Sequence, residues 1–391
     1  MKTQLGAGLM IALTLSGCNS QINSPPMGIN CLPNSVNWKE CRNIKIVSNP
    51  YYPGDQTPQL TVQSFDPTFE KIVGRTPNLV PLATGFGFLE GPVYLKNKDG
   101  KGGSVFVTDQ VHNSIYAIEW NGLQDGMITT KSWNKPKLFR NPSGVANGQT
   151  PDMTGNLLTA ETTGRRVSIT KDFKPNQESP EPQANTLIGS FKGKKLNSPN
   201  DLVVKSDGSV WFTDPSYGSL QFPPQPAQLP NNVYRYDPKT KQLTVIEGDL
   251  VMPNGIAFGP EEKTIYIIDS GAIQGPRTYF SYLPHRIYLY NLSQDGRSLK
   301  DKKLFANVSP GFPDGMRLDE NGNIYVGTLE GIHVINPAGK LIGKFLMAKQ
   351  TANLSFGGTH NNILFIGSSN SLWAIKLNTK GLVPIRTRSI N

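Results

Sequence analysis

The stretch SPNDLVVKSDGSVWFTDPSYG, residues 198–218, decides the fold class of this chain. Residues 201–205 are mostly apolar, Ser206-Asp207-Gly208 has the composition of a tight turn, and residues 209–213 are mainly β-branched or aromatic. This pattern is typical of a β-hairpin. Pro199 and Asn200 precede its first strand, and such a pair favours a rigid turn with a short polar side chain at the strand start. We therefore expect an antiparallel pair of strands that presents Asn200 at one end.

The same pattern occurs six times in the chain. Each unit has a turn-started first strand, a second strand after a short turn, a third strand and room for a fourth. The residues at the start of each first strand, here called the anchors, are separated by 57, 53, 54, 60 and 39 residues, and they are Glu90, Asn147, Asn200, Asn254, Asp314 and Asn353. Four-stranded units of this size are typical of propeller blades. The sequence predicts an all-β, six-bladed β-propeller, because a β-sandwich would explain the strands but not the repeat.

Composition favours the same fold class. The 391 residues are enough for a large core, and 39 Gly with 31 Pro indicate a turn-rich β protein. The formal net charge of +10 comes from scattered Lys and Arg, with small clusters at 192–195 and 300–303. We interpret these clusters as solvated loop faces, and we expect no nucleic-acid partner.

The first 17 residues, MKTQLGAGLMIALTLSG, have the pattern of an export signal. Lys2 precedes an apolar run at 5–15 that is too short to span a membrane. The ending Leu15-Ser16-Gly17-Cys18 resembles the bacterial lipobox, in which the signal is cut before a lipid-carrying cysteine. We expect Cys18 to anchor the chain in a bacterial cell envelope, on the periplasmic or outer face. The alternative is an ordinary secretory signal with Cys18 nearby.

The two other cysteines are Cys31 and Cys41, ten residues apart. In an exported chain this spacing favours one local disulfide over two free thiols. Residues 18–60 are rich in Asn, Ser and Pro, so we interpret them as a lipid-anchored tether with a small disulfide collar. Residues 61–391 would then form the propeller.

The anchors suggest a metal site. The first strand of every blade lines the central channel of a propeller, so equivalent positions in different units converge on one mouth. Glu90, Asn200, Asn254 and Asp314 supply only oxygen ligands, which suit Ca²⁺ best, with Zn²⁺ or Mn²⁺ as alternatives. The competing interpretation is that these residues are turn formers that satisfy backbone groups at strand starts.

The chain resembles the family of six-bladed propellers that contains senescence marker protein, gluconolactonase and luciferin-regenerating enzyme. The resemblance covers about residues 85–377 and is closest to the fungal-type lactonohydrolase branch. Its motifs are Leu89-Glu90-Gly91-Pro92, Ser198-Pro199-Asn200-Asp201, Phe212-Thr213-Asp214-Pro215, Pro253-Asn254-Gly255 and Pro313-Asp314-Gly315. Together these motifs are specific, whereas each alone is weak.

The resemblance implies that Glu90, Asn254 and Asp314 bind one divalent metal and that Asn200 contacts the metal or the substrate. Family members open lactone rings: the cation polarises the carbonyl, and Asp314 would act as general base. A neighbouring cation is expected to lower the pKa of this carboxyl. A small lactone would be the substrate, and we expect a monomer.

Two positions depart from the family pattern. The animal branch has Arg where this chain has Ser198, and a His that often follows the acid of the second unit is replaced by Thr162. Both positions bear on the identity of the lactone. We name Asn147 and Arg165 as the candidates for substrate binding, and a structural role is the favoured alternative for each.

Other interpretations remain open from the sequence. A non-catalytic metal-dependent binding propeller, or one similar to strictosidine synthase, would keep the same scaffold. The outer strand of the last blade is supplied either by residues 79–83 or by residues 382–387. The insertion at 271–284 is either a lid over the channel mouth or a packed loop.

Overall fold

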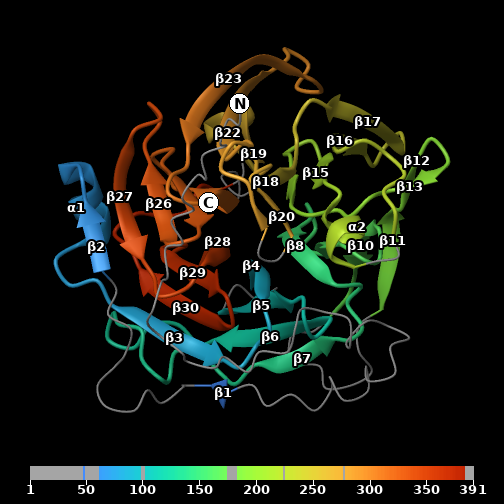
Figure 1. Cartoon of the computed structure of the whole chain (residues 1–391). Coiled ribbons are helices and arrows are strands. Elements are labelled where there is room, and N and C mark those ends of the chain that lie inside the picture. Colours follow the sequence, from blue (N-terminus) through green and yellow to red (C-terminus); the bar gives the residue numbers. More distant parts are fainter. Residues whose placement is uncertain are drawn as a thin grey trace, which may run out of the picture.

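The computed structural model describes residues 61–97, 102–173, 183–222, 225–275 and 278–383, with the backbone of Val47–Ser48. Six antiparallel sheets follow one another around a central axis in sequence order, from cyan to red in Figure 1. The predicted six-bladed β-propeller is confirmed. The three cysteines, and with them the signal, lipidation and disulfide predictions, lie outside the described residues.

The first three blades each contain four consecutive strands. Blade 1 consists of β4 (Leu89–Lys96), β5 (Gly103–Asp109), β6 (Ser114–Trp120) and β7 (Lys137–Arg140). Blade 2 consists of β8 (Ala146–Pro151), β9 (Leu157–Glu161), β10 (Arg166–Thr170) and β11 (Ala184–Ile188). Blade 3 consists of β14 (Leu202–Val204), β15 (Val210–Asp214), β16 (Asn232–Asp237) and β17 (Gln242–Glu247).

The last three blades complete the ring. Blade 4 consists of β18 (Pro253–Phe258), β19 (Thr264–Asp269), β22 (Arg286–Leu292) and β23 (Leu299–Asn307). Blade 5 consists of β24 (Pro313–Leu318), β25 (Ile324–Thr328), β26 (Gly331–Ile335) and β27 (Leu341–Leu346). Blade 6 takes three strands from the end of the chain, β28 (Thr351–Gly357), β29 (Ile363–Ser368) and β30 (Ser371–Lys376).

Strands from the beginning of the chain finish blades 5 and 6. β3 (Leu79–Thr84) pairs antiparallel with β30 and supplies the fourth strand of blade 6, and β1 (Val47–Ser48) pairs with β3. β2 (Thr61–Ser64) pairs with β27 at the outer edge of blade 5. Figure 1 shows blue β3 beside red β30. The segment at 79–83 is therefore the closing strand, and its hydrogen bonds join the beginning of the ring to its end.

Few helices accompany the sheets. α1 (Pro67–Val73) begins after Asp66, whose carboxylate accepts a hydrogen bond from the Thr68 amide at 3.0 Å, and it has Pro at its first position. α2 (Tyr217–Gln221) lies after blade strand β15, and η2 (Pro260–Glu262) connects β18 to β19. Two-stranded ribbons are formed by β12 (Ser190–Phe191) with β13 (Lys194–Lys195) and by β20 (Ile273–Gly275) with β21 (Thr278–Tyr279). None of the described helices is long and apolar enough to cross a bilayer.

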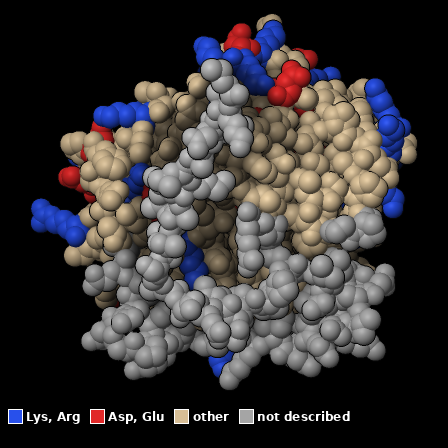
Figure 2. Space-filling view, viewed as in Figure 1, with Lys and Arg blue, Asp and Glu red and all other residues tan. Residues whose placement is uncertain are grey.

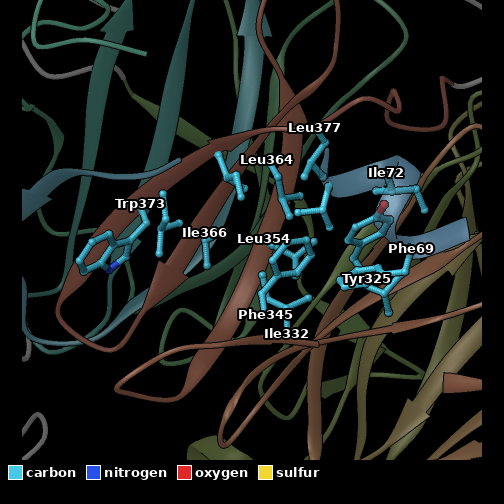
Figure 3. Close-up of a cluster of buried hydrophobic side chains, with 14 of the residues drawn as sticks. Phe69, Ile72, Tyr325, Ile332, Phe345, Leu354, Leu364, Ile366, Trp373 and Leu377 are labelled. Carbon is cyan, nitrogen blue, oxygen red and sulfur yellow. The ribbon is translucent and has the colours of Figure 1, made fainter. Parts of the chain in front are cut away.

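The core lies between neighbouring blades. Figure 3 shows the cluster between blades 5 and 6, where apolar side chains of both sheets and of α1 point toward one another. Phe69 of α1 packs edge-to-face on Phe345, with ring centroids 5.2 Å apart. Burying one such large side chain stabilises the fold by about 1.5–3 kcal/mol. α1 therefore fastens the start of the chain to the last two blades.

Charged side chains gather at the rim in the view of Figure 2. The exposed outer strand β23 carries Lys300, Asp301, Lys302 and Lys303, and the β12–β13 ribbon carries exposed Lys194 and Lys195. Both basic clusters of the sequence thus lie on peripheral strands and away from the channel axis.

Candidate active site

A bulge lies at or beside the anchor in five of the six inner strands. The pairing register with the second strand shifts between Glu90 and Val93 in β4, and the same kind of shift occurs in β8, β18, β24 and β28. A bulge inserts an extra residue and re-aims a side chain, and bulges are common beside active sites. In blades 4 and 5 the bulges contain the Pro-Asn-Gly and Pro-Asp-Gly motifs.

Glycine follows four of the anchors for a steric reason. A Cβ atom on Gly91 or Gly148 would lie less than 3.0 Å from the carbonyl oxygen of the anchor in the next blade, Asn147 or Asn200. Gly255 has the same relation to the Asp314 carbonyl. Only glycine permits such close approach of one backbone to another. The glycines bring the anchors of successive blades side by side at one end of the channel.

Aspartates at the ends of the second strands hold the loops that lead into the inner strands. The Asp109 carboxylate accepts hydrogen bonds from the Gly87 and Phe88 amides, just before Glu90. Asp214 and Asp269 do the same before Asn200 and Asn254. Burial raises the pKa of Asp214 to about 7. These buried carboxylates position the anchors but do not belong to the anchor ring.

The anchors form one buried ring. Their exposed fractions are only 2–8%, and the inner strands of neighbouring blades contact each other all the way around. Asn254 Nδ2 donates to Asp314 Oδ1 at 3.0 Å, and the Asn353 side chain is hydrogen-bonded to the Glu90 carboxylate. The predicted metal ligands of blades 1, 4 and 5 are thus part of one constellation.

Burial dominates the electrostatics of the two ring carboxylates. It raises the pKa of Asp314 to about 7, although hydrogen bonds from Asn254 and Gln350 oppose the rise. Burial, followed by the charge of Asp314, raises the pKa of Glu90 well above its usual range. Within the described residues neither carboxylate forms an ion pair. Two buried acids without a cationic partner are costly unless protonated or neutralised by a cation.

The donor set of the ring fits a hard cation. In the described part of the chain no group of three His, Cys, Asp or Glu side chains is arranged so that it could hold a metal ion by itself. The ring instead combines two carboxylates with amide side chains, all of which offer oxygen. The amides of Asn147 and Asn200 make no side-chain hydrogen bond among the described residues, so both are free to contact a ligand.

Two residues that the sequence did not indicate also reach the ring. The Tyr217 hydroxyl, from α2, lies 3.4 Å from Asn254 Nδ2, and Gln350 Nε2 donates to Asp314 Oδ2 at 3.2 Å. Burial and the charge of Asp314 raise the pKa of Tyr217 well above 10. Tyr217 lies within the motif-rich stretch at 198–218, and Gln350 lies three residues before the anchor Asn353. These positions are the only local signals in the sequence that point to the two residues.

Arg165 and Ser198 are held by the protein backbone. Arg165 lies in the turn between β9 and β10, and its guanidinium donates to the carbonyls of Leu196 at 2.6 Å and Pro226 at 3.2 Å. The Ser198 hydroxyl accepts a hydrogen bond from the Gly218 amide at 2.8 Å. Ser198 therefore secures the start of α2, and the predicted contact of Arg165 with substrate stays a prediction.

A cavity of about 530 Å³ opens at the other end of the channel. It is lined by the far ends of the inner strands, among them Val93–Lys96 of β4 and Leu202–Val204 of β14, and by Leu382 and Val383. No anchor lines it. We call this end the lower end and the end with the anchors the upper end.

Comparison with known proteins identifies the family of this chain. A family described as "SMP-30/Gluconolactonase/LRE-like region" matches residues 88–370, which span all six anchors. The chain belongs to this family. The family resemblance expected from the sequence is confirmed.

Relatives share most of the chain. A gluconolactonase from Zymomonas mobilis is 27% identical over 337 residues, which cover 82% of this chain and 87% of the relative. The lactonohydrolase oryL from Aspergillus oryzae is 27% identical and covers 63% of this chain and 59% of its own length. The structure of XC5397 from Xanthomonas campestris, described as a gluconolactonase, has 26% identity and a TM-score of 0.67, and it covers 85% of this chain and 98% of XC5397.

Proposed function

We propose that this chain is a metal-dependent lactonase that opens a sugar-type or related lactone. The observation that carries the proposal is the buried ring in which Glu90 and Asp314, from blades 1 and 5, lie with Asn254 of blade 4. Membership of the gluconolactonase-containing family and the lactone-hydrolysing relatives support the same reaction.

The residues present fit one divalent cation. Glu90, Asn254 and Asp314 would hold it, and their oxygen donors favour Ca²⁺ over Zn²⁺ or Mn²⁺. When bound, the cation would polarise the lactone carbonyl and stabilise negative charge on its oxygen. Its charge would also lower the pKa of Asp314 from the value of about 7 that burial produces without a cation.

Asp314 is the residue that moves the proton in this proposal. Its carboxylate removes a proton from water as the water oxygen bonds to the lactone carbonyl carbon. The ring C–O bond then breaks, and the released ring oxygen takes the proton from Asp314, which leaves a hydroxy acid. Gln350 and Asn254 each donate to one oxygen of this carboxylate, so its orientation is fixed before substrate binds.

Asn200 and Asn147 complete the proposed substrate contacts. Their amides belong to the ring and can donate to the carbonyl or hydroxyl oxygens of a lactone. Arg165, which is already held by two carbonyls, would contribute by shaping the adjacent wall.

The test is hydrolysis of gluconolactone, followed as acid release, by the purified full chain. We expect turnover that stops with a chelator and returns with Ca²⁺. Readdition of Mn²⁺ or Zn²⁺ in parallel ranks the metals. Turnover that a chelator does not affect would contradict the metal dependence. Binding of lactone without turnover would favour a non-catalytic binding propeller instead.

We also propose that Cys18 carries a lipid anchor in the cell envelope, on the basis of the Leu15-Ser16-Gly17-Cys18 motif. Fractionation of cells that express Cys18→Ala tests this. We expect the variant to leave the membrane fraction, and an unchanged distribution would contradict the anchor.

A further inference from the structure

The layer directly below the anchors is formed by the residue that follows each of them. Four of these six residues are glycine, which lets neighbouring blades pack closely here, and the set is Gly91, Gly148, Asp201, Gly255, Gly315 and Leu354. Asp201 is the one charged member. Its side chain is 1% exposed, and its Oδ1 approaches the position that a Cβ on Gly148 would fill. A third carboxylate therefore lies immediately beneath the ring.

Asp201 is paired across the channel. Arg317 Nη1 lies 3.3 Å from Asp201 Oδ2 and also donates to the Met316 carbonyl at 2.7 Å. Asp201 precedes the inner strand of blade 3, whereas Arg317 belongs to the inner strand of blade 5. Because blade 4 stands between them in the ring, the ion pair spans the channel.

Arg317 also marks the boundary with the lower cavity. It stands three residues after its anchor, and the equivalent positions all line that cavity: Val93, Thr150, Val203, Ala257 and Phe356. Arg317 is the one charged residue of this layer. Its side chain is 19% exposed, while Asp201 above it is almost fully buried. The pair lies between the polar ring and the mainly apolar lower cavity.

The charges of the two layers add to a simple sum. Glu90, Asp314 and Asp201 contribute −3 when ionised and Arg317 contributes +1, which gives −2. The charge of Asp201 acts on both ring carboxylates. A net charge of −2 in a buried site is neutralised by one divalent cation, whereas −3 or −1 is not.

We infer that the Arg317–Asp201 pair is the floor of the metal pocket and sets its charge so that a divalent cation is preferred over a trivalent one. The inference rests on the proposed metal site. It assigns to Arg317 and Asp201 a positioning and specificity role at a distance from the substrate.

The experiment compares Ca²⁺ and Tb³⁺ binding by calorimetry in the full chain and in three variants of similar shape. Asp201→Asn leaves a charge of −1, Arg317→Met leaves −3, and the double variant restores −2. We expect Asp201→Asn to weaken Ca²⁺ binding about tenfold or more, because one buried charge is lost. We expect Arg317→Met to raise the preference for Tb³⁺ over Ca²⁺ by about tenfold, and the double variant to return it to within about threefold of the original.

Thermal unfolding without metal gives an independent readout. Arg317→Met should lower the melting temperature, because Asp201 is left buried without its partner, and the double variant should recover most of the loss. If Arg317→Met does not fold, the Ca²⁺ affinities of Asp201→Asn and of the double variant still test the inference. Of these two, only the double variant should bind Ca²⁺ nearly as well as the original chain. Arg297→Met, which removes one exposed surface charge, is the control.

Two results would overturn the inference. One is an equal Tb³⁺ to Ca²⁺ preference in all variants and in Arg297→Met. The other is a chain that binds neither ion. Lactone hydrolysis is measured separately. A chain that hydrolyses lactones but lacks this charge-dependent ion preference would contradict the role of the Arg317–Asp201 pair and would still support the proposed lactonase activity.

Discussion

The upper and lower ends of the channel are built from the same six strands but carry different chemistry. At the upper end the strand starts present Glu, Asp and Asn side chains that are almost completely buried. At the lower end the strand ends present Val, Leu and Phe around a cavity of about 530 Å³. Empty volume and chemically competent side chains therefore occur at opposite ends. Pocket size alone points to the end opposite the proposed active site.

The sharpest test of this comparison is Asp314→Asn at the upper end. The substitution keeps the shape and removes the proton acceptor, so we expect kcat/KM for gluconolactone to fall by roughly a thousandfold. Glu261→Gln, an acid that lines the lower cavity, is the matched control and should change kcat/KM less than about twofold. Equal losses in both variants would remove the distinction between the ends.

The second prediction concerns pH at the upper end. In the metal-free chain burial raises the pKa of Asp314 to about 7, so below that pH a cation must displace a proton from Asp314. Burial also raises the pKa of Glu90 well above its usual range. Affinity for Ca²⁺ should therefore rise with pH. From Asp314 alone we expect binding roughly thirtyfold weaker at pH 5.5 than at pH 8, as calorimetry would measure. A flat profile would show that these carboxylates are not the ligands.

The third prediction uses the close contact between blades at the upper end. A Cβ on Gly255 would lie 2.5 Å from the Asp314 carbonyl oxygen, so Gly255→Ala must push two inner strands apart. We expect a loss of about 1–3 kcal/mol in unfolding free energy and about tenfold in kcat/KM. Gly275→Ala is the control, because its nearest neighbour would lie 3.7 Å away. An active, fully stable Gly255→Ala would show that the ring tolerates displacement.

The smallest effect is expected at the lower end. Val203→Phe places a ring against the cavity without touching the anchors, and we expect kcat/KM within about twofold of the original. The measurement is steady-state hydrolysis of gluconolactone beside a melting curve that verifies folding. A loss of tenfold or more would mean that the lower cavity takes part in substrate binding.

Short-range chemistry explains what the sequence predicted well. Related turn motifs such as Pro-Asn-Asp, Pro-Asn-Gly and Pro-Asp-Gly report local turn geometry, and they follow one another at blade spacing, so the six blades and the anchor ring could be predicted. The same local reasoning placed Glu90, Asn254 and Asp314 among the anchors, and the family resemblance selected these three as metal ligands. Nothing near Asp201 in the sequence distinguishes it from a turn former at a strand start.

Long-range partners explain what the sequence left open. Arg317 pairs with Asp201, which lies 116 residues away in the sequence, and Gln350 contacts Asp314, which lies 36 residues away. No local sequence pattern indicates either contact. The role of Arg165 depends on two backbone carbonyls that only the folded chain supplies. The sequence did not decide whether residues 79–83 or 382–387 supply the outer strand of the last blade, because both segments have β propensity. Strand pairing is decided by tertiary context.

The junction of β3 with β30 has a consequence for biosynthesis. Leu79 of β3 pairs with Ile375 of β30, which is 296 positions later in the chain (375 − 79). During synthesis β3 therefore emerges long before its partner strand. At about 5–20 residues per second, the ribosome needs roughly 15–60 s to make that partner. Throughout this interval β3 presents an unpaired apolar strand that is prone to wrong partners. A holding chaperone that covers this segment until the last blade emerges would increase the yield of closed rings.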